Sequence, residues 1–466
     1  MRKSSSALLF VFLSVFAFFC QAQSNYFSQD QFITIVRNYH PVCIQSEILV
    51  KQGENSIQRE KGWLDPVIKA SLDEKTFESK DYFRLINPSL VVPTWYGIDF
   101  KAGYDANTGV FLNPENTVPT DGLLYGGVSV PIGQGLFTDK RRTAIKQAQT
   151  FAESTLIEQR KILNDLFFEA IKSYWKWVEA WNEYIIYEQS VELAKTRFEA
   201  VKTSFKFGDK PAIDTLEAFI QIQNREVSKQ QAFINYRNHT LELSNFLWYE
   251  NNTPMLIGDN LQPPKLQELP FLRYKNIDTI TDFIQNSSTQ HPDFLLYEFK
   301  ANLIAIEKAL KVENLKPKLN LNYNFLTQTQ GISFSPQNYK WGVDFNFPIL
   351  LRKERAEVKL AELKLQDIKL EQNLKLLEIQ NKIRGYYNEQ QFLSEQTVLL
   401  RNIVTNYNRL LDGEKQKFNT GESSIFLVNS RENNLISAQL KLINSIAKYN
   451  ISVAGVQWAS GDLYRE

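Results

Sequence analysis

The chain of 466 residues is long enough for about three domains of ordinary size or for one large one. Its 53 lysines and arginines balance 52 aspartates and glutamates, which argues against a nucleic-acid-binding protein, and a hydrophobic share of 43% argues against bulk disorder. Two cysteines and three histidines exclude a cysteine-based zinc site and nearly exclude a disulfide scaffold.

The N-terminus has the pattern of a secretory signal peptide. A basic start precedes an apolar stretch over residues 7–19, and small residues follow around Ala22. We therefore expect residues 1–22 to be removed on export. Cys20 would leave with them, and Cys43 would stay as a single cysteine that can form no internal disulfide. The alternatives are a retained membrane anchor and lipidation of Cys20.

The remaining chain repeats one plan twice. Each half contains the same five features in the same order: a His-Pro step, a strand-like segment closed by proline, a long helical segment, a glycine break and a tryptophan. The paired landmarks are His40 and His291, Pro131 and Pro348, Gly208 and Gly421, and Trp248 and Trp458. Because order and spacing agree, we infer a tandem duplication, with a first repeat over 23–250, a turn-rich linker over 251–276 and a second repeat over 277–466.

Strand patterns follow an initial helical segment in each repeat. The helical segments are 29–62 and 277–314, and the strand-like stretches are 67–72, 95–104 and 123–130 in the first repeat and 318–325 and 339–347 in the second. Their alternation of apolar and polar residues is typical of a half-buried soluble strand and also of a transmembrane strand.

A membrane role would require these strands to form a barrel. No stretch after the signal peptide is apolar over about eighteen residues, and only helices and closed barrels satisfy the backbone in lipid. Four or five strands are too few to close a barrel in one chain, so subunits would have to pool them. An odd number of spans in the first repeat would leave the next helix on the wrong side, so we expect Val67–Leu72 to lie outside the barrel or to continue another strand.

Two very long helices are the dominant feature of the sequence. Segment 139–205 contains neither glycine nor proline, and segment 353–418 matches it in length. Each would extend for about 100 Å and needs lateral partners, as in a coiled coil. After its glycine break each chain segment returns as a second helix, over 211–248 and over 423–456. An aromatic run in the first long helix is expected to pack between helices; it comprises Tyr174, Trp175, Trp177 and Trp181.

This combination resembles the TolC-like outer-membrane efflux protein family. The resemblance rests on the signal peptide, the duplication, the order of strands before long helices, and two turn-and-restart segments, Gly208–Ala218 and Gly421–Asn429. It implies a mixed, mostly α-helical fold in which duplicated strand and long-helix repeats form a homotrimer. Each subunit would give four strands to a twelve-stranded outer-membrane β-barrel, which a periplasmic α-helical barrel would continue.

The same resemblance implies a function and partners. The protein would be the passive exit channel of a tripartite efflux or type I secretion system, in the outer membrane of a Gram-negative bacterium with its tunnel in the periplasm. A periplasmic adaptor (membrane fusion) protein, an inner-membrane pump and outer-membrane lipid would be its partners, with no nucleic acid. The alternative is a periplasmic coiled-coil scaffold or adaptor that does not enter the membrane.

The resemblance also places a candidate aperture at the turns between the long helices. Asp214 follows the first glycine break where the family carries an acidic residue, so three copies would form an acidic ring. Asp209 and Glu422 are further candidates. Leu427 and Ser430 stand where the second copy of the family pattern is acidic, so the gate chemistry differs. The structural alternative for Asp214 is an acid that complements a helix N-terminus.

Candidate adaptor contacts lie in the same two turns. They are Gly208, Gly421, Ser423, Ser424 and Asn429. Turn and capping chemistry would explain the two serines equally well.

No residue set indicates an enzyme, a metal site or a cofactor. Motifs for nucleophilic hydrolases, zinc peptidases and nucleotide-binding loops are missing from the sequence. His40 and His291 occupy equivalent places in the two repeats, which favours a structural role over metal binding. A periplasmic hydrolase is a remote third possibility.

Overall fold

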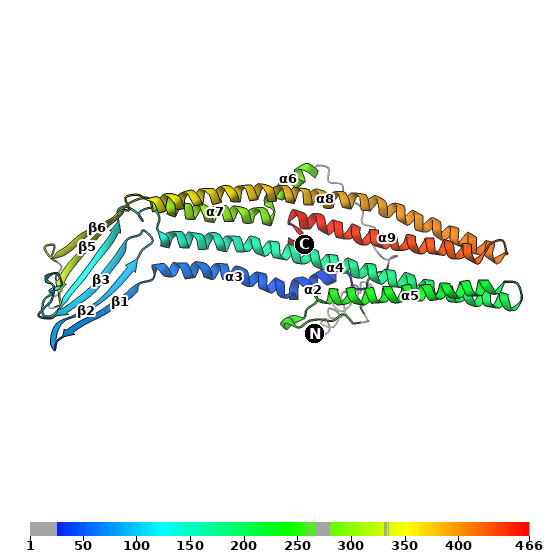
Figure 1. The fold of residues 1–466 in the computed structure, drawn as a ribbon, viewed down its shortest axis with the longest axis horizontal. Coiled ribbons are helices and arrows are strands. Elements are labelled where there is room, and N and C mark those ends of the chain that lie inside the picture. Colours follow the sequence, from blue (N-terminus) through cyan, green and yellow to red (C-terminus); the bar gives the residue numbers. More distant parts are fainter. Residues whose placement is uncertain (1–25, 259–260, 266–279, 330–332, 334, 466) are drawn as a thin grey trace, which may run out of the picture. The chain divides into compact units, whose positions relative to one another are not determined.

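The computed structural model describes residues 26–258, 261–265, 280–329, 333 and 335–465. The predicted signal peptide lies outside these residues. The chain divides into two compact units, and each draws on both sequence repeats (Figure 1). The described residues of the helical unit lie within 26–45, 162–287 and 379–465, and those of the sheet unit lie within 46–161 and 288–378.

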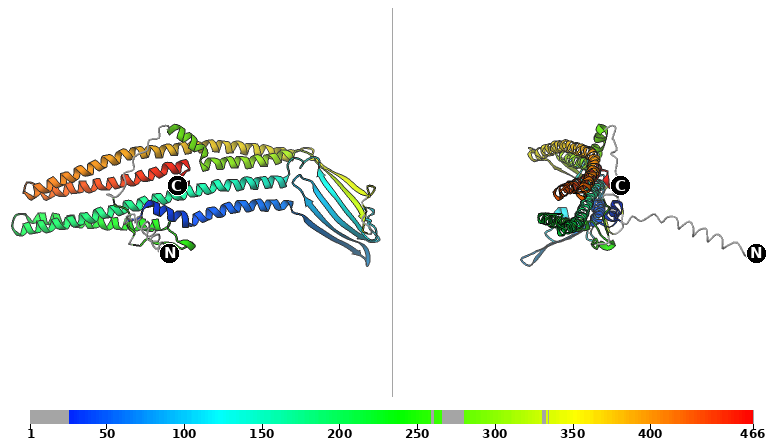
Figure 2. Two further views of the ribbon diagram at one scale, coloured as in Figure 1. Left: turned by 180° about the vertical axis from the view of Figure 1, so that it is seen from behind. Right: turned by 90° about the vertical axis from the view of Figure 1, so that its right-hand side faces the viewer.

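The sheet unit contains one antiparallel sheet of six strands in the order β1-β2-β3-β4-β5-β6 (Figures 1 and 2). Every strand pairs with its neighbour in sequence, so the two repeats meet where β4 pairs with β5. The strands are β1 (Val67–Phe77), β2 (Lys80–Pro93), β3 (Asp99–Thr108), β4 (Leu123–Pro131), β5 (Lys318–Gln328) and β6 (Tyr339–Asn346).

Strand β2 corrects two predictions. All three strand-like stretches of the first repeat lie in the sheet, and β2 supplies the fourth strand that restores an even number of spans. Val67–Leu72 is therefore part of a strand of its own and not a continuation of another, and the sheet of the described residues holds six strands where four were expected. Strand β2 was not predicted from the sequence because it contains Pro88. Proline has no backbone N–H to donate to a neighbouring strand and therefore argues against a strand. The β2–β3 ladder indeed skips Asn87 and Pro88.

The two predicted initial helical segments are each broken at a His-Pro step. Helices α2 (Gln29–Tyr39) and α3 (Pro41–Lys61) meet at His40, and α6 (Ile280–Gln290) and α7 (Pro292–Glu313) meet at His291. Each imidazole Nδ1 accepts a hydrogen bond from a backbone N–H two residues on, at 3.2 Å for His40 and 3.1 Å for His291. The two histidines therefore cap equivalent helices, as their repeat positions predicted.

The long helices agree closely with their predicted bounds. Helix α4 (Lys140–Lys206) is followed by α5 (Ala212–Ser244), and α8 (Arg352–Asn419) by α9 (Ile425–Ser460). Helix α5 ends before the predicted Trp248, which instead forms an isolated β-bridge with Pro254. Within the described part of the chain, no helix is both long enough and apolar enough to cross a bilayer.

Aromatic packing forms the core of the helical unit. Trp177 is fully buried, and its indole N–H donates to Thr240 Oγ1 at 3.0 Å. Tyr174 stacks on Phe32 with ring centroids 5.7 Å apart, and its hydroxyl donates to the Phe27 carbonyl at 2.8 Å. The aromatic run on α4 thus binds α2 and α5 to it, which confirms the predicted packing role.

Candidate functional site at the helical tips

Two turns of the same geometry end the long helices in the helical unit (Figure 1). Gly208 and Gly421 have φ of +80° and +81°, the left-handed region that favours glycine. The next residue in each turn closes the helix: Asp209 N–H donates to the Ser204 carbonyl at 2.9 Å, and Glu422 N–H to Lys417 at 2.8 Å. This pattern is the Schellman motif, in which the turn satisfies carbonyls left free at a helix C-terminus.

Alanine at Gly208 or at Gly421 should destabilise the helical unit by about 1 kcal/mol, because a side chain disfavours the left-handed conformation. No other part of the chain lies within 4 Å of a Cβ added at either position, so the cost comes from the local backbone conformation alone. Gly413→Ala is the matched control, since Gly413 has equally open surroundings but lies inside α8. It should stabilise by about 0.5–1 kcal/mol. Urea unfolding midpoints measure all three, and a shift of the same sign at all three glycines would contradict the assignment.

The candidate aperture acids lie at or next to these turns. Asp214 is half-buried in the first turn of α5, where its charge complements the helix N-terminus. Asp209 and Glu422 are exposed turn residues. The position of Asp214 therefore fits the alternative of a charge that complements the helix N-terminus, although no side chain caps α5 by a hydrogen bond. The acidic ring is kept as a proposal.

Both serines of the second tip are held by local contacts. The Ser424 hydroxyl accepts a hydrogen bond from Leu427 N–H at 3.4 Å and caps α9. The Ser423 hydroxyl donates to Glu414 Oε1 at 2.5 Å, and Arg431 Nε reaches Glu414 Oε2 at 3.4 Å. The bond from Ser423, helped by Arg431, holds the pKa of Glu414 below its usual value. The exposed surface of this tip is therefore set by a short chain of polar contacts from α8 to α9.

A buried charged cluster joins the two helical hairpins near their tips. Arg197 on α4 makes a two-pronged bond to Glu432 on α9, at 2.9 and 3.0 Å. Arg225 on α5 donates to the same carboxylate at 2.7 Å. Arg197 also donates to Asn429 Oδ1 at 2.7 Å. We call these four residues the Glu432 cluster.

The Glu432 cluster is deeply buried and carries more positive than negative charge. The exposed fractions of Arg225 and Glu432 are 4% and 2%. Burial lowers the pKa of Arg225, the Glu432 carboxylate raises it, and Arg197 lowers it further; the net effect is a pKa below the usual value. Nε and Nη1 of Arg225 have no hydrogen-bond partner within the described residues. One carboxylate thus offsets two guanidinium groups, which makes Glu432 the residue on which the cluster depends.

Asn429 belongs to this cluster and not to an outer contact surface. Its side chain is buried, accepts from Arg197, and donates to Glu217 Oε1 at 3.3 Å. Its amide is used within the chain, so we assign it to the link between hairpins. The other four adaptor-contact candidates lie at the exposed turns or beside them.

Sequence reasoning missed the cluster, although a signal was present. Buried positions on α5 recur at helical spacing and interrupt an apolar stripe with one arginine; they are Ala218, Ile222, Arg225, Ala232 and Tyr236. On α9, Glu432 lies between the buried Val428 and Leu435 in the same way. A charged residue on a core-facing stripe needs a partner, but the sequence does not show which one.

Apolar and cation–π contacts complete the site. Val201, Ala218 and Ile425 form a small buried cluster with Phe198 and Phe418 packed against it. Lys210 in the first tip lies over the Phe418 ring, 4.9 Å from its centroid. The two tips therefore contact each other directly within the chain. Among the described residues, no group of three or more His, Cys, Asp or Glu side chains is arranged to hold a metal ion.

Solved structures share this fold over nearly all of the chain. The Campylobacter jejuni CmeC outer membrane channel matches with a TM-score of 0.65 at 14% identity, over 93% of this chain and 85% of that chain. Vibrio cholerae VceC, an outer membrane protein, matches with a TM-score of 0.66 at 12% identity, over 93% and 95%. The Neisseria gonorrhoeae MtrE outer membrane channel in its open state gives 0.67 at 12%, over 94% and 89%.

These similarities lie in the fold. No protein-family model matches the chain, and no curated protein sequence matches it. Identities of 11–14% with TM-scores of 0.65–0.67 show a common architecture of strands and long helical hairpins. The mostly helical fold with strands before long helical hairpins, which the sequence predicted, is therefore confirmed, with a sheet of six strands among the described residues.

Proposed function

We propose that the protein is an outer-membrane channel, a homotrimer that serves as the passive exit channel of a tripartite efflux or type I secretion system. The observation that carries the proposal is the two-faced sheet. One row of paired residues across all six strands is entirely non-polar, and comprises Ile68, Leu90, Ala102, Gly126, Phe325 and Tyr339. The opposite face carries a polar network, in which Asn322 accepts from Ser129 at 2.6 Å and donates to Asp344 at 2.8 Å.

These two faces suit lipid on one side and a water-filled lumen on the other. The similarity to solved outer membrane channels supports the same location. A periplasmic scaffold, the alternative, would expose this apolar sheet face to water, which is unfavourable. We therefore favour the channel, with the described helical hairpins on the periplasmic side.

Exposed apolar stripes in the helical unit support association with further copies. Every seventh residue along α5 is apolar and exposed: Ile213, Ile220, Val227, Ile234 and Leu241. Helix α8 has a similar exposed set in Phe392, Leu399, Ile403 and Leu410. A heptad repeat of apolar residues is the pattern of a coiled-coil seam. We propose that these seams pack against neighbouring subunits in the trimer.

We further propose that the tips are the periplasmic aperture and the adaptor-binding region. Asp214, Asp209 and Glu422 are the aperture candidates, and the exposed turns at Gly208 and Gly421 with Ser423 and Ser424 are the adaptor-contact candidates. An adaptor protein and an inner-membrane pump would be the partners. The Glu432 cluster supports this assignment, because it couples both hairpins immediately behind the tips.

Single-channel recording in planar bilayers tests the proposal. The purified protein should conduct ions without an energy source, and Asp214→Ala should change the conductance or its dependence on the cation. Ser228→Ala is the control, since Ser228 also lies on α5, away from the tips. Absence of any conductance in the native protein would contradict the channel. Unchanged conductance in Asp214→Ala, with the trimer intact, would leave Asp214 only its helix-terminal role.

A further inference from the structure

The additional hairpin β1–β2 has the same two faces as the rest of the sheet. On β1, Ile68, Ala70 and Leu72 alternate with polar residues, and their partners on β2 are Leu90, Pro88 and Ile86. The opposite face of β1 carries Lys69, Ser71, Asp73 and Lys75. Because cross-strand partners share a face, the apolar row through Ile68 continues from β6 to β1, and the charged pair Glu74–Arg84 lies on the same face nearer the β1–β2 turn. The hairpin is therefore built as part of the barrel wall.

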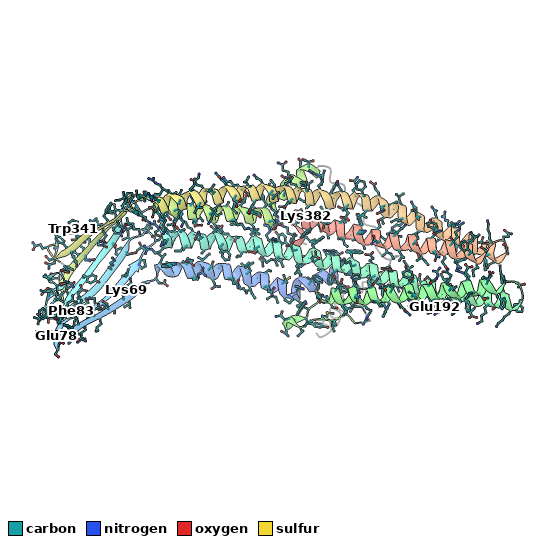
Figure 3. The ribbon with its side chains drawn as sticks, viewed as in Figure 1. Lys69, Glu78, Phe83, Glu192, Trp341 and Lys382 are labelled. Atoms are coloured by element: carbon teal, nitrogen blue, oxygen red, sulfur yellow. The ribbon has the colours of Figure 1, made fainter. Side chains whose placement is uncertain are left out.

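Strands β1 and β6 are the two edges of this sheet. Each pairs on one side only among the described residues. Figure 3 labels Lys69 on β1 and Trp341 on β6, on these outer strands. All eleven residues of β1 are exposed, and the side chains of Trp341, Val343 and Phe345 on β6 are exposed as well. An open edge with an apolar face is a template for pairing with another chain.

We propose that β1 of one copy pairs with β6 of the next, with Val67 opposite Asn346, so that three copies close a barrel of eighteen strands. This inference rests on the trimer proposed above and changes what the trimer builds. Three sheets of six strands give eighteen strands. Successive strands are antiparallel, and each sheet has an even number of strands, so β1 and a neighbouring β6 also run in opposite directions. The strand pair at each junction between copies is therefore antiparallel, like every other pair in the barrel.

The register follows first from the faces. Joining apolar face to apolar face requires an even-numbered residue of β1 opposite an odd-numbered residue of β6. With Val67 opposite Asn346, all eight residues of β6 find a partner on β1. Ile68 then faces Phe345, Ala70 faces Val343, and Leu72 faces Trp341.

Charge selects this register over its neighbours. On the polar face it places Lys69 opposite Asp344 and Asp73 opposite Lys340, two pairs of opposite sign. A shift of two residues in one direction would set Lys75 against Lys340, a like-charge pair, which is unfavourable when directly opposite. A shift of two residues in the other direction leaves Asn346 and Phe345 without partners on β1.

The strand tilt gives an independent check. A line across the sheet from Val67 meets Lys101 on β3 and Lys340 on β6, through printed partners on each strand. In the proposed register the next residue on that line is Asp73 of the neighbouring copy, six residues further along β1. The line across the sheet therefore advances by six residues for each copy. Three copies give a barrel shear that equals the number of strands. Equal shear and strand number correspond to a tilt of about 36°, within the range of outer-membrane barrels.

An eighteen-stranded barrel is about one and a half times as wide as a twelve-stranded one, because diameter grows roughly linearly with strand number. Barrels of about 16–18 strands leave an open aqueous channel. The lumen would carry the Lys69–Asp344 and Asp73–Lys340 pairs at each junction between copies. The membrane section of the channel would therefore be wide, and the helical tips would set the narrowest point.

Disulfide cross-linking in isolated outer membranes tests the register. Ser71→Cys and Gly342→Cys are combined in one chain in a Cys43→Ala background, because these two positions face each other in the proposed pairing. A cysteine at Gly342 meets no atom within 4 Å of its Cβ. On oxidation, most of the protein should migrate as a covalent trimer. Ser71→Cys with Asp344→Cys is the matched control, since diagonal neighbours are about 7–8 Å apart, too far to bridge.

A third pair tests the twelve-stranded alternative. If β1 and β2 lay outside the wall, β6 would pair with β3, and Gly342→Cys would link to Lys101→Cys or Asp105→Cys. Efficient linking there, or a trimer in which Ser71 and Gly342 stay unlinked, overturns the eighteen-stranded barrel while the channel stands. Efficient linking of the control pair overturns the register. If light scattering finds no trimer, the proposed function fails as well.

Discussion

Glu432→Ala should destabilise the helical unit by about 3–5 kcal/mol, because removing one partner of a buried ion pair leaves uncompensated charge. Arg197 and Arg225 both bond to this carboxylate, at 2.7–3.0 Å, and Arg225 is 4% exposed. The two guanidinium groups would then repel each other across the space between the hairpins. Chemical unfolding followed by tryptophan fluorescence measures the loss, because the tryptophans of α4 lie in the same unit.

Two further variants separate the charge from other effects. Glu422→Ala removes an exposed acid at the neighbouring tip and should change stability by less than about 0.5 kcal/mol. Glu432→Gln keeps the volume and an acceptor but not the charge, so it should fall between the native protein and Glu432→Ala. A Glu432→Ala protein as stable as Glu422→Ala would show that the cluster does not hold the hairpins together.

Trp177→Ala should cost about 3–5 kcal/mol, the range for truncating a fully buried aromatic residue. Its exposed fraction is 0%, and it projects from α4 into a core cluster that also contains residues of α2 and α5. The indole also donates to Thr240, whose hydroxyl keeps its own bond to the Tyr236 carbonyl at 2.8 Å. The loss is therefore mainly packing and cavity formation.

Trp63→Ala is the matched control for that substitution. Trp63 is 60% exposed, in a short 3-10 helix of the sheet unit. Its removal should shift the thermal unfolding midpoint little. Similar shifts in the two variants would contradict the assignment of the α4 aromatic residues to the core.

The long helices could be predicted closely from sequence, because their signals are local. Segment 139–205 became α4 (Lys140–Lys206), and the glycine breaks became Schellman turns at Gly208 and Gly421. The sheet was harder to predict. Pro88 and Pro93 punctuate β2, and its pairing with β1 and β3 comes from tertiary contacts that override the local preference.

The candidate site likewise has one part that could be predicted from the sequence and one part that could not. The turn glycines and the capping Ser424 follow from local chemistry, and their positions could be read from the sequence. The Glu432 cluster could not, because Arg197 and Arg225 are more than two hundred residues from Glu432 along the chain. Asn429 was noticed as part of a turn motif, but its burial depends on a helix from the other repeat.

The mass and image of the detergent-extracted protein test the central claim most directly. Light scattering should give three copies of the 54.1 kDa chain, less the signal peptide if it is removed. Negative-stain images should show a tube about 100 Å long, the span of its long helices, below a detergent belt. A rod of one or two copies that is extracted without detergent would contradict the channel and favour the periplasmic scaffold.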